Sequence, residues 1–112
     1  MSYDTNPLYH PENFDPPLRV VAELDAYEPD YSFDIFLVVQ EIDTGKVYVA
    51  DDSGCSCPTP FEDHNTLGDF TEVRSWEDVK REYNARFPGG YRQAASVQSI
   101  RNAVVGALRR AA

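Results

Sequence analysis

The segment FDIFLVVQEI, at residues 33–42, constrains the fold more than any other part of the chain. In a strand its apolar side chains would occupy both faces: Phe33, Ile35, Leu37 and Val39 on one, and Phe36, Val38 and Ile42 on the other. A strand that is apolar on both sides is typical of the centre of a sheet. The next residues, Asp43-Thr44-Gly45-Lys46, place a glycine where a short hairpin needs positive φ, so residues 46–50 are predicted to return antiparallel.

Two further segments have the pattern of strands. Residues 18–26 alternate between apolar and polar side chains, which predicts a half-buried strand with these residues on its buried face: Leu18, Val20, Ala22, Leu24 and Ala26. Residues 70–74, FTEVR, are long enough for a short fourth strand. The strands therefore predict a meander of three or four members.

The apolar period changes to that of a helix at Ser75. Ser75 and Asp78 resemble a capping box, and aromatic or apolar residues then recur at helical spacing, at Trp76, Val79, Tyr83 and Phe87. Pro88-Gly89-Gly90 ends this helix, and a second one is predicted from residue 93 or 96 to residue 110. We expect an α+β fold, in which a three- to four-stranded antiparallel β-meander precedes two C-terminal helices packed on one face.

The chain of 112 residues fits one domain. Residues 1–17 contain four prolines, Pro7, Pro11, Pro16 and Pro17, so they are predicted to form an extended Pro-rich N-terminal arm, and residues 18–112 a single α+β domain. No segment has the roughly 20 apolar residues of a membrane helix, and the first residues lack the features of an export signal. We expect a cytoplasmic protein with reduced thiols.

Charge is unevenly distributed along the sequence. The net charge is −9, of which residues 1–78 contribute −15 and residues 79–112 contribute +6. The acidic part would repel phosphate, so direct binding of nucleic acid is not expected there. The basic part can complement a helix dipole or dock on acidic groups, of this chain or of a partner.

The stretch DDSGCSCPTPFEDH, at residues 51–64, contains both cysteines and is expected to be a loop. Cys55, Cys57 and His64 could hold zinc, with a nearby aspartate as fourth ligand, although the C-x-C spacing differs from the usual C-x2-C pair. A reactive thiol is disfavoured because the surrounding acids raise a cysteine pKa, and a Cys55–Cys57 disulfide would be strained. A purely structural loop explains the same composition.

Four residues of this stretch are the predicted contacts with a partner. Pro58 and Pro60 would hold the backbone extended, and Phe61 would then be displayed between acids. The predicted interaction loop therefore has as its binding residues Asp52, Phe61, Glu62 and Asp63. No catalytic residues are predicted, and no cofactor beyond the zinc alternative.

The segment from Tyr31 to His64, followed by LGDFTEV and a tryptophan-led helix, resembles a family of small uncharacterised proteins of actinobacteria and their bacteriophages. The resemblance spans residues 18–87 and is most specific at DSGCSCP and PFED. It implies an accessory protein, and it carries no activity or catalytic residue with it.

The sequence thus favours a small non-enzymatic interaction protein, related to phage proteins, that contacts a host or phage protein. A homo-oligomer through the arm, a sheet edge or the last helix is a further expectation. It would act in the host cytoplasm if phage-encoded, or as a virion component. Two alternatives stay open: a zinc-stapled module or metalloenzyme built on Cys55, Cys57 and His64, which chelation would destabilise, and an acidic mimic of nucleic acid.

Overall fold

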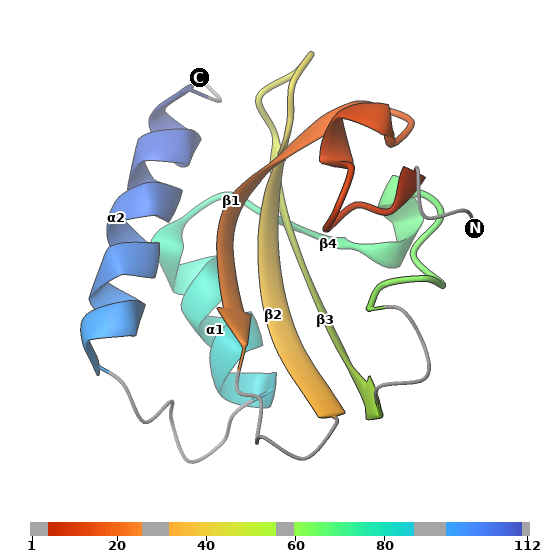
Figure 1. The fold of residues 1–112 in the computed structure, drawn as a ribbon. Coiled ribbons are helices and arrows are strands. Elements are labelled where there is room, and N and C mark those ends of the chain that lie inside the picture. The colour runs from red at the N-terminus through yellow and green to blue at the C-terminus, as the bar shows by residue number, and fades with distance from the viewer. Residues whose placement is uncertain (1–4, 26–31, 56–59, 87–93, 111–112) are drawn as a thin grey trace.

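The computed structural model describes residues 5–25, 32–55, 60–86 and 94–110. Its regular elements, in chain order, are η2 (Pro11–Asn13), β1 (Leu18–Asp25), β2 (Ser32–Glu41), β3 (Val47–Cys55), η3 (Leu67–Asp69), β4 (Thr71–Val73), α1 (Trp76–Arg86) and α2 (Ala94–Arg110). The four strands form one antiparallel sheet in the order β1-β2-β3-β4 (Figure 1). The predicted α+β meander followed by two helices is confirmed.

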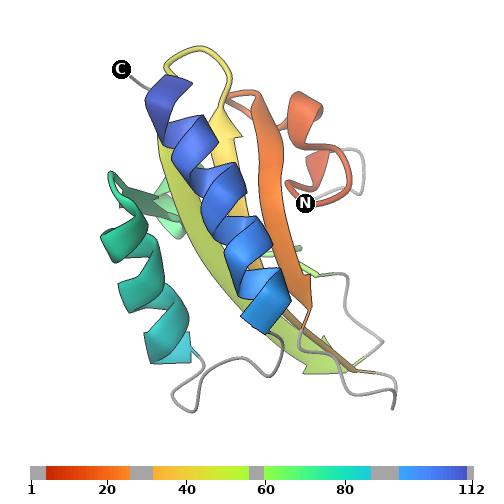
Figure 2. The same ribbon diagram turned by 90° about the vertical axis from the view of Figure 1, so that its left-hand side faces the viewer.

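The central strand β2 is buried on both faces, as its sequence predicts. On one face, which we call the helix face, α1 and α2 lie side by side over the sheet (Figure 2). The core of this face consists of Leu24, Phe36, Val38, Val47, Val49, Val73, Val79, Tyr83, Ile100, Val104 and Ala107. Of the residues that recur at helical spacing along the first predicted helix, Val79 and Tyr83 lie in this core, and Phe87 lies outside the described residues.

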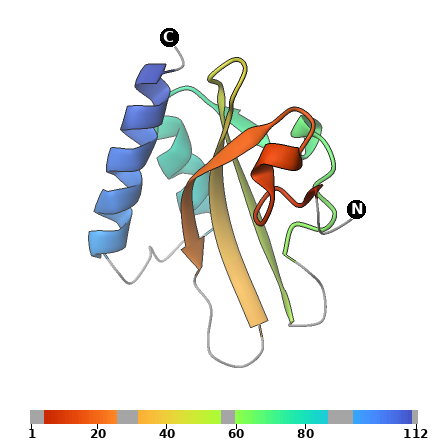
Figure 3. The same ribbon diagram turned by 45° about the horizontal axis from the view of Figure 1, so that its top comes forward.

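The opposite face, which we call the arm face, is covered by the N-terminal arm and by residues 60–70 (Figure 3). Its core consists of Phe14, Leu18, Ile35, Leu37, Val39, Tyr48, Ala50, Phe61, Phe70 and the partly buried Leu8, Val20 and Leu67. The two covering segments are bonded to each other, because Asn6 Nδ2 donates to the Pro60 carbonyl at 2.8 Å and the rings of Phe14 and Phe70 meet edge to face.

The arm differs from the extended segment that its prolines predict. Its described part contains a turn, in which Asn6 Oδ1 accepts hydrogen bonds from the backbone N–H groups of Leu8 and Tyr9, and then the 3-10 helix η2. Proline is compatible with the first turn of a helix because its missing N–H would have no partner there. Folding the arm compactly lets Phe14 reach the core.

A β-bulge in β1 overturns the predicted face pattern of that strand. The pairing register with β2 shifts between Val20 and Ala22, so the strand gains one residue at Val21. Leu18 and Val20 consequently face the arm, whereas Ala22 and Leu24 face the helices. Strict alternation would have put all four on one face, and one extra residue reverses the sides from that point onward.

Gln40 is a polar residue buried on the helix face, with only 3% of its surface exposed. Its Oε1 accepts hydrogen bonds from Nε and Nη2 of Arg19 on β1. Its Nε2 donates to the Gly45 carbonyl in the hairpin at 2.8 Å and to the Ala107 carbonyl in α2 at 2.9 Å. One amide thus joins two strands, a turn and the last helix, with every hydrogen-bonding position in use.

Replacing Gln40 by Ala should lower the free energy of unfolding by about 3 kcal/mol or more, because it leaves buried carbonyls and a guanidinium without their partner. Urea denaturation measures the change. The matched control is Gln98→Ala, at an exposed glutamine whose side chain donates to Asn102, and it should change stability by less than about 0.5 kcal/mol. Equal losses in the two variants would contradict the role assigned to Gln40.

Candidate functional site

The stretch 51–64 begins as strand rather than as loop. β3 continues to Cys55, five residues beyond the predicted end of the strand at residue 50. Asp52 lies within it and faces the arm side, where its Oδ2 accepts a hydrogen bond from the Phe61 N–H at 2.8 Å and its Oδ1 one from the Ser53 N–H at 3.0 Å. Asp52 therefore anchors the returning chain to the sheet.

Phe61 is buried completely, which corrects the expectation that it is displayed to a partner. Its side chain is 0% exposed and packs in the arm-face core. Its backbone has φ of 62°, in the left-handed region, where a bulky residue is uncommon. The Asp52 hydrogen bond and the packing of the ring hold it there. A buried aromatic ring cannot contact a partner, so of the predicted contacts only Glu62 and Asp63 lie exposed.

His64 lies against aromatic rings. Its ring meets Phe61 and Phe70 edge to face, at centroid distances of 5.0 and 5.4 Å, and its buried Nδ1 has no hydrogen-bond partner among the described residues. The Cys55 side chain and the whole of Cys57 lie outside the described residues. No described group of three or more His, Cys, Asp or Glu side chains is arranged to hold a metal ion. Zinc binding by Cys55, Cys57 and His64 stays a prediction.

The outer edge of β3 pairs with no described strand at Ala50–Cys55, six of the nine residues of β3. On this edge β4 pairs with Val47–Val49 and no described strand continues beyond it, whereas on the opposite edge β2 pairs with β3 as far as Cys55. The Glu41 N–H donates to the Lys46 carbonyl at 2.8 Å, which sets the alternation of hydrogen-bonded pairs between β2 and β3. By that alternation, the backbone groups of Ala50 and Asp52 point to β2, and those of Asp51 and Ser53 point outward.

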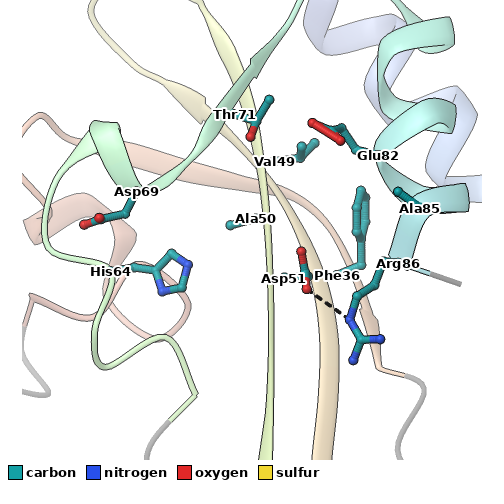
Figure 4. A pocket seen from close by; sticks show the side chains of 10 residues that line it. All are labelled: Phe36, Val49, Ala50, Asp51, His64, Asp69, Thr71, Glu82, Ala85 and Arg86. Carbon is teal, nitrogen blue, oxygen red and sulfur yellow. Dashed lines mark ion pairs between the residues drawn. The ribbon is translucent and has the colours of Figure 1, made fainter.

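A groove of about 350 Å³ lies along this open edge, and we call it the edge groove (Figure 4). One wall is the end of α1, with Glu82, Ala85 and Arg86, and the other is the segment that carries His64 and Asp69. Thr71 closes one end, and the floor is formed by Phe36, Val49, Ala50 and Asp51. The groove therefore lies where β4 would continue if it were longer.

Charged side chains line the edge groove, with carboxylates in excess. On the helix-face side of the open edge, the Asp51 carboxylate of β3 forms an ion pair with Arg86 of α1, with Oδ2 and Nε 3.0 Å apart. Asp69 accepts hydrogen bonds from the backbone N–H groups of Asn65 and Thr66, and these, with the nearby His64, hold the pKa of Asp69 below its usual value. Glu82 adds a third carboxylate on α1.

The edge groove was not foreseen from the sequence, since it depends on the unequal lengths of two paired strands. A weak signal is present in the sequence: the strand-like segment at residues 70–74 is shorter than the segment that precedes the cysteines. In the sequence, Asp51 is one of the acids near the two cysteines, and no local pattern assigns a role to Asp69, Glu82 or Arg86. These four residues come from β3, from the segment before β4 and from α1, so they meet only because the chain leaves the sheet after β3 and returns to it at β4.

Phe61→Ala should destabilise the protein by about 3–5 kcal/mol, because it removes a fully buried aromatic ring from the arm-face core. Glu62→Ala, at the exposed neighbouring position, is the matched control and should stay within about 0.5 kcal/mol of the parent. Thermal and urea unfolding of the two variants provide the comparison. A Phe61→Ala protein as stable as the parent would show that the ring is not part of the core.

Comparison with known proteins gives one family. The profile of a family described as a domain of unknown function (DUF7574) matches residues 5–111. The match includes the arm and α2, both outside the stretch that carries the resemblance noted from the sequence. Searches of curated proteins and of solved structures give no match. No helix among the described residues is long and apolar enough to span a bilayer.

Proposed function

This chain belongs to the DUF7574 family of domains of unknown function, and we propose that it is a non-enzymatic interaction protein whose edge groove binds an extended, basic segment of a partner protein. The observation that carries the proposal is the open edge of β3 on the floor of a walled groove. An unpaired strand edge presents N–H and C=O groups that a second strand can use, and this is a common mode of peptide recognition.

The backbone of β3 supplies the first part of recognition. An incoming strand would lie in line with β4 and pair with the outward-facing N–H and C=O groups of Asp51. At Ser53 it would replace the hydrogen bond that the N–H now donates to Asp52. Side chains of the added strand would alternate between the wall formed by α1 and the wall that carries His64.

Charge supplies the second part. Among the described lining residues, Asp51, Asp69 and Glu82 stand against one arginine, Arg86, which already pairs with Asp51. Lysine or arginine side chains on the added strand would find the carboxylates of Asp51 and Glu82, and Asp69 adds negative charge behind the other wall. The net charge of −9 on the whole chain favours the encounter with a basic partner. An acidic segment would be repelled by the same groups.

The resemblance to proteins of actinobacteria and their phages favours a partner from the host or from a phage. In this proposal the protein acts as an accessory factor, and contact with the partner is its function. A second copy of the chain is the competing occupant of the edge groove, because an open strand edge can also pair between identical molecules.

A synthetic hexapeptide of alternating lysine and valine is the probe. We expect it to shift the amide NMR signals of Asp51 and Ser53, to slow exchange of the Asp51 amide, and to bind several-fold more tightly than the matching glutamate–valine peptide. A version of the lysine peptide with N-methylated backbone amides should lose binding, since it cannot form the ladder.

Two exposed alanines give a matched pair of variants. Ala85→Tyr places a ring in the edge groove and should abolish binding, whereas Ala103→Tyr, on the exposed side of α2, should bind as the parent does. Peptide shifts that fall outside the groove, or equal affinities for these two variants, would overturn the proposal. Concentration-dependent dimerisation that Ala85→Tyr abolishes would assign the groove to a second copy, and would overturn it as well.

A further inference from the structure

A second cleft, of about 280 Å³, lies between the β2–β3 hairpin and the last turn of α2. It shares no lining residue with the edge groove, and its cationic lining residues are Arg19 and Arg110. The polar residues Gln40, Glu41, Asp43 and Thr44 complete most of the wall. Its ligand is therefore a separate question from the function proposed above.

The guanidinium of Arg19 is held in a fixed orientation. Its Nε and Nη2 both donate to Gln40 Oε1, and Gln40 is held in turn by the Gly45 and Ala107 carbonyls. These bonds occupy one side of the planar group and leave the donors of Nη1 available. Because Gln40 is buried in the core, the Arg19 guanidinium is hydrogen-bonded to a fixed side chain rather than to a mobile one at the surface.

Arg110 brings a second positive charge to the same cleft. Burial and the proximity of Arg110 both lower the pKa of Arg19, although an arginine keeps its charge at neutral pH. Neither arginine forms an ion pair with any described residue. Two neighbouring cations with no ion-pair partner among the described residues are unusual in a chain with nineteen acids.

Two carboxylates also line the cleft, and neither forms an ion pair with Arg19 or Arg110. Glu41 is 9% exposed and is hydrogen-bonded to Tyr48, which lies on the arm face of the sheet. Asp43 is exposed in the hairpin turn. The last carbonyls of α2 would repel an anion, but the Ala107 carbonyl already accepts a hydrogen bond from Gln40, and α2 ends with Arg109 and Arg110.

From this arrangement we propose that the cleft binds a phosphate group, held between the guanidinium groups of Arg19 and Arg110. Arginine matches the oxygens of phosphate with two parallel N–H donors, and such charge-assisted bonds are the strongest that a protein offers. The cleft is at the small end of ligand-binding pockets, which suits one phosphate group rather than a large ligand. Binding also relieves the repulsion between the two arginines.

The test is a titration with inorganic phosphate at pH 7, with chloride adjusted to keep the ionic strength constant. The parent protein should show saturable shifts of the Arg19 and Arg110 side-chain NMR signals and a rise in melting temperature. Arg110→Gln should weaken binding about tenfold, since it removes charge-assisted hydrogen bonds. Arg109→Gln removes the same charge from the adjacent exposed position, which does not line the cleft, and should stay within about twofold of the parent.

A parallel titration with glycerol phosphate shows whether the phosphate group belongs to a phosphate monoester or is free inorganic phosphate. Tighter binding than inorganic phosphate identifies a phosphate monoester as the ligand, and equal or weaker binding identifies free phosphate. NMR shifts that do not saturate with phosphate would overturn the proposal. Equal weakening of phosphate binding in Arg110→Gln and Arg109→Gln would also overturn it, because binding would then reflect only the general charge of α2.

Discussion

The burial of β2 on both faces is the constraint on which the rest of the structure depends. Phe36, Val38 and Gln40 need a cover on one side, and Ile35, Leu37 and Val39 need one on the other. Two helices supply the first cover. The second comes from segments with little regular structure, the arm and residues 60–70, which are joined by Asn6 and by the contact of Phe14 with Phe70.

The open edge of β3 follows from that second cover. After β3 the chain must pass over the arm face to bring Phe61, Leu67 and Phe70 into the core. It returns to the sheet only at Thr71, so β4 is three residues long and pairs with the first part of β3. The groove is therefore a consequence of how the fold buries its central strand. Asp52 stabilises this path by bonding the Phe61 N–H to the strand that the chain has left.

Much of the fold could be predicted from the sequence, because it depends on local periodicity. The two-sided strand, the hairpin at Gly45 and the helix that begins after Ser75 each have a local signature, and the Ser75 hydroxyl accepts a hydrogen bond from the Asp78 N–H as a cap should. The bulge at Val21 has no such signature, since one extra residue in a run of apolar side chains leaves the composition unchanged.

The candidate site was less predictable, because it depends on contacts between distant segments. Phe61 between acids has the local appearance of an exposed contact residue, and only the packing of the arm on the sheet shows that it is core. Similarly, Asp51 and Arg86 are thirty-five positions apart and meet because the last turn of α1 lies beside the middle of β3 (Figure 4). The sequence indicates the region around Asp52 as a contact site, but it predicts an exposed Phe61, whereas the ring is buried.

Amide hydrogen exchange of the unliganded protein, followed by NMR, tests the central claim most directly. The account predicts protected amides at Val49, which pairs with β4, and at Ala50, which pairs with β2, and rapid exchange at Asp51, whose N–H faces the open edge. Protection of Asp51 equal to that of Val49 would mean that another part of the protein already occupies the edge. The groove could not then receive a partner strand.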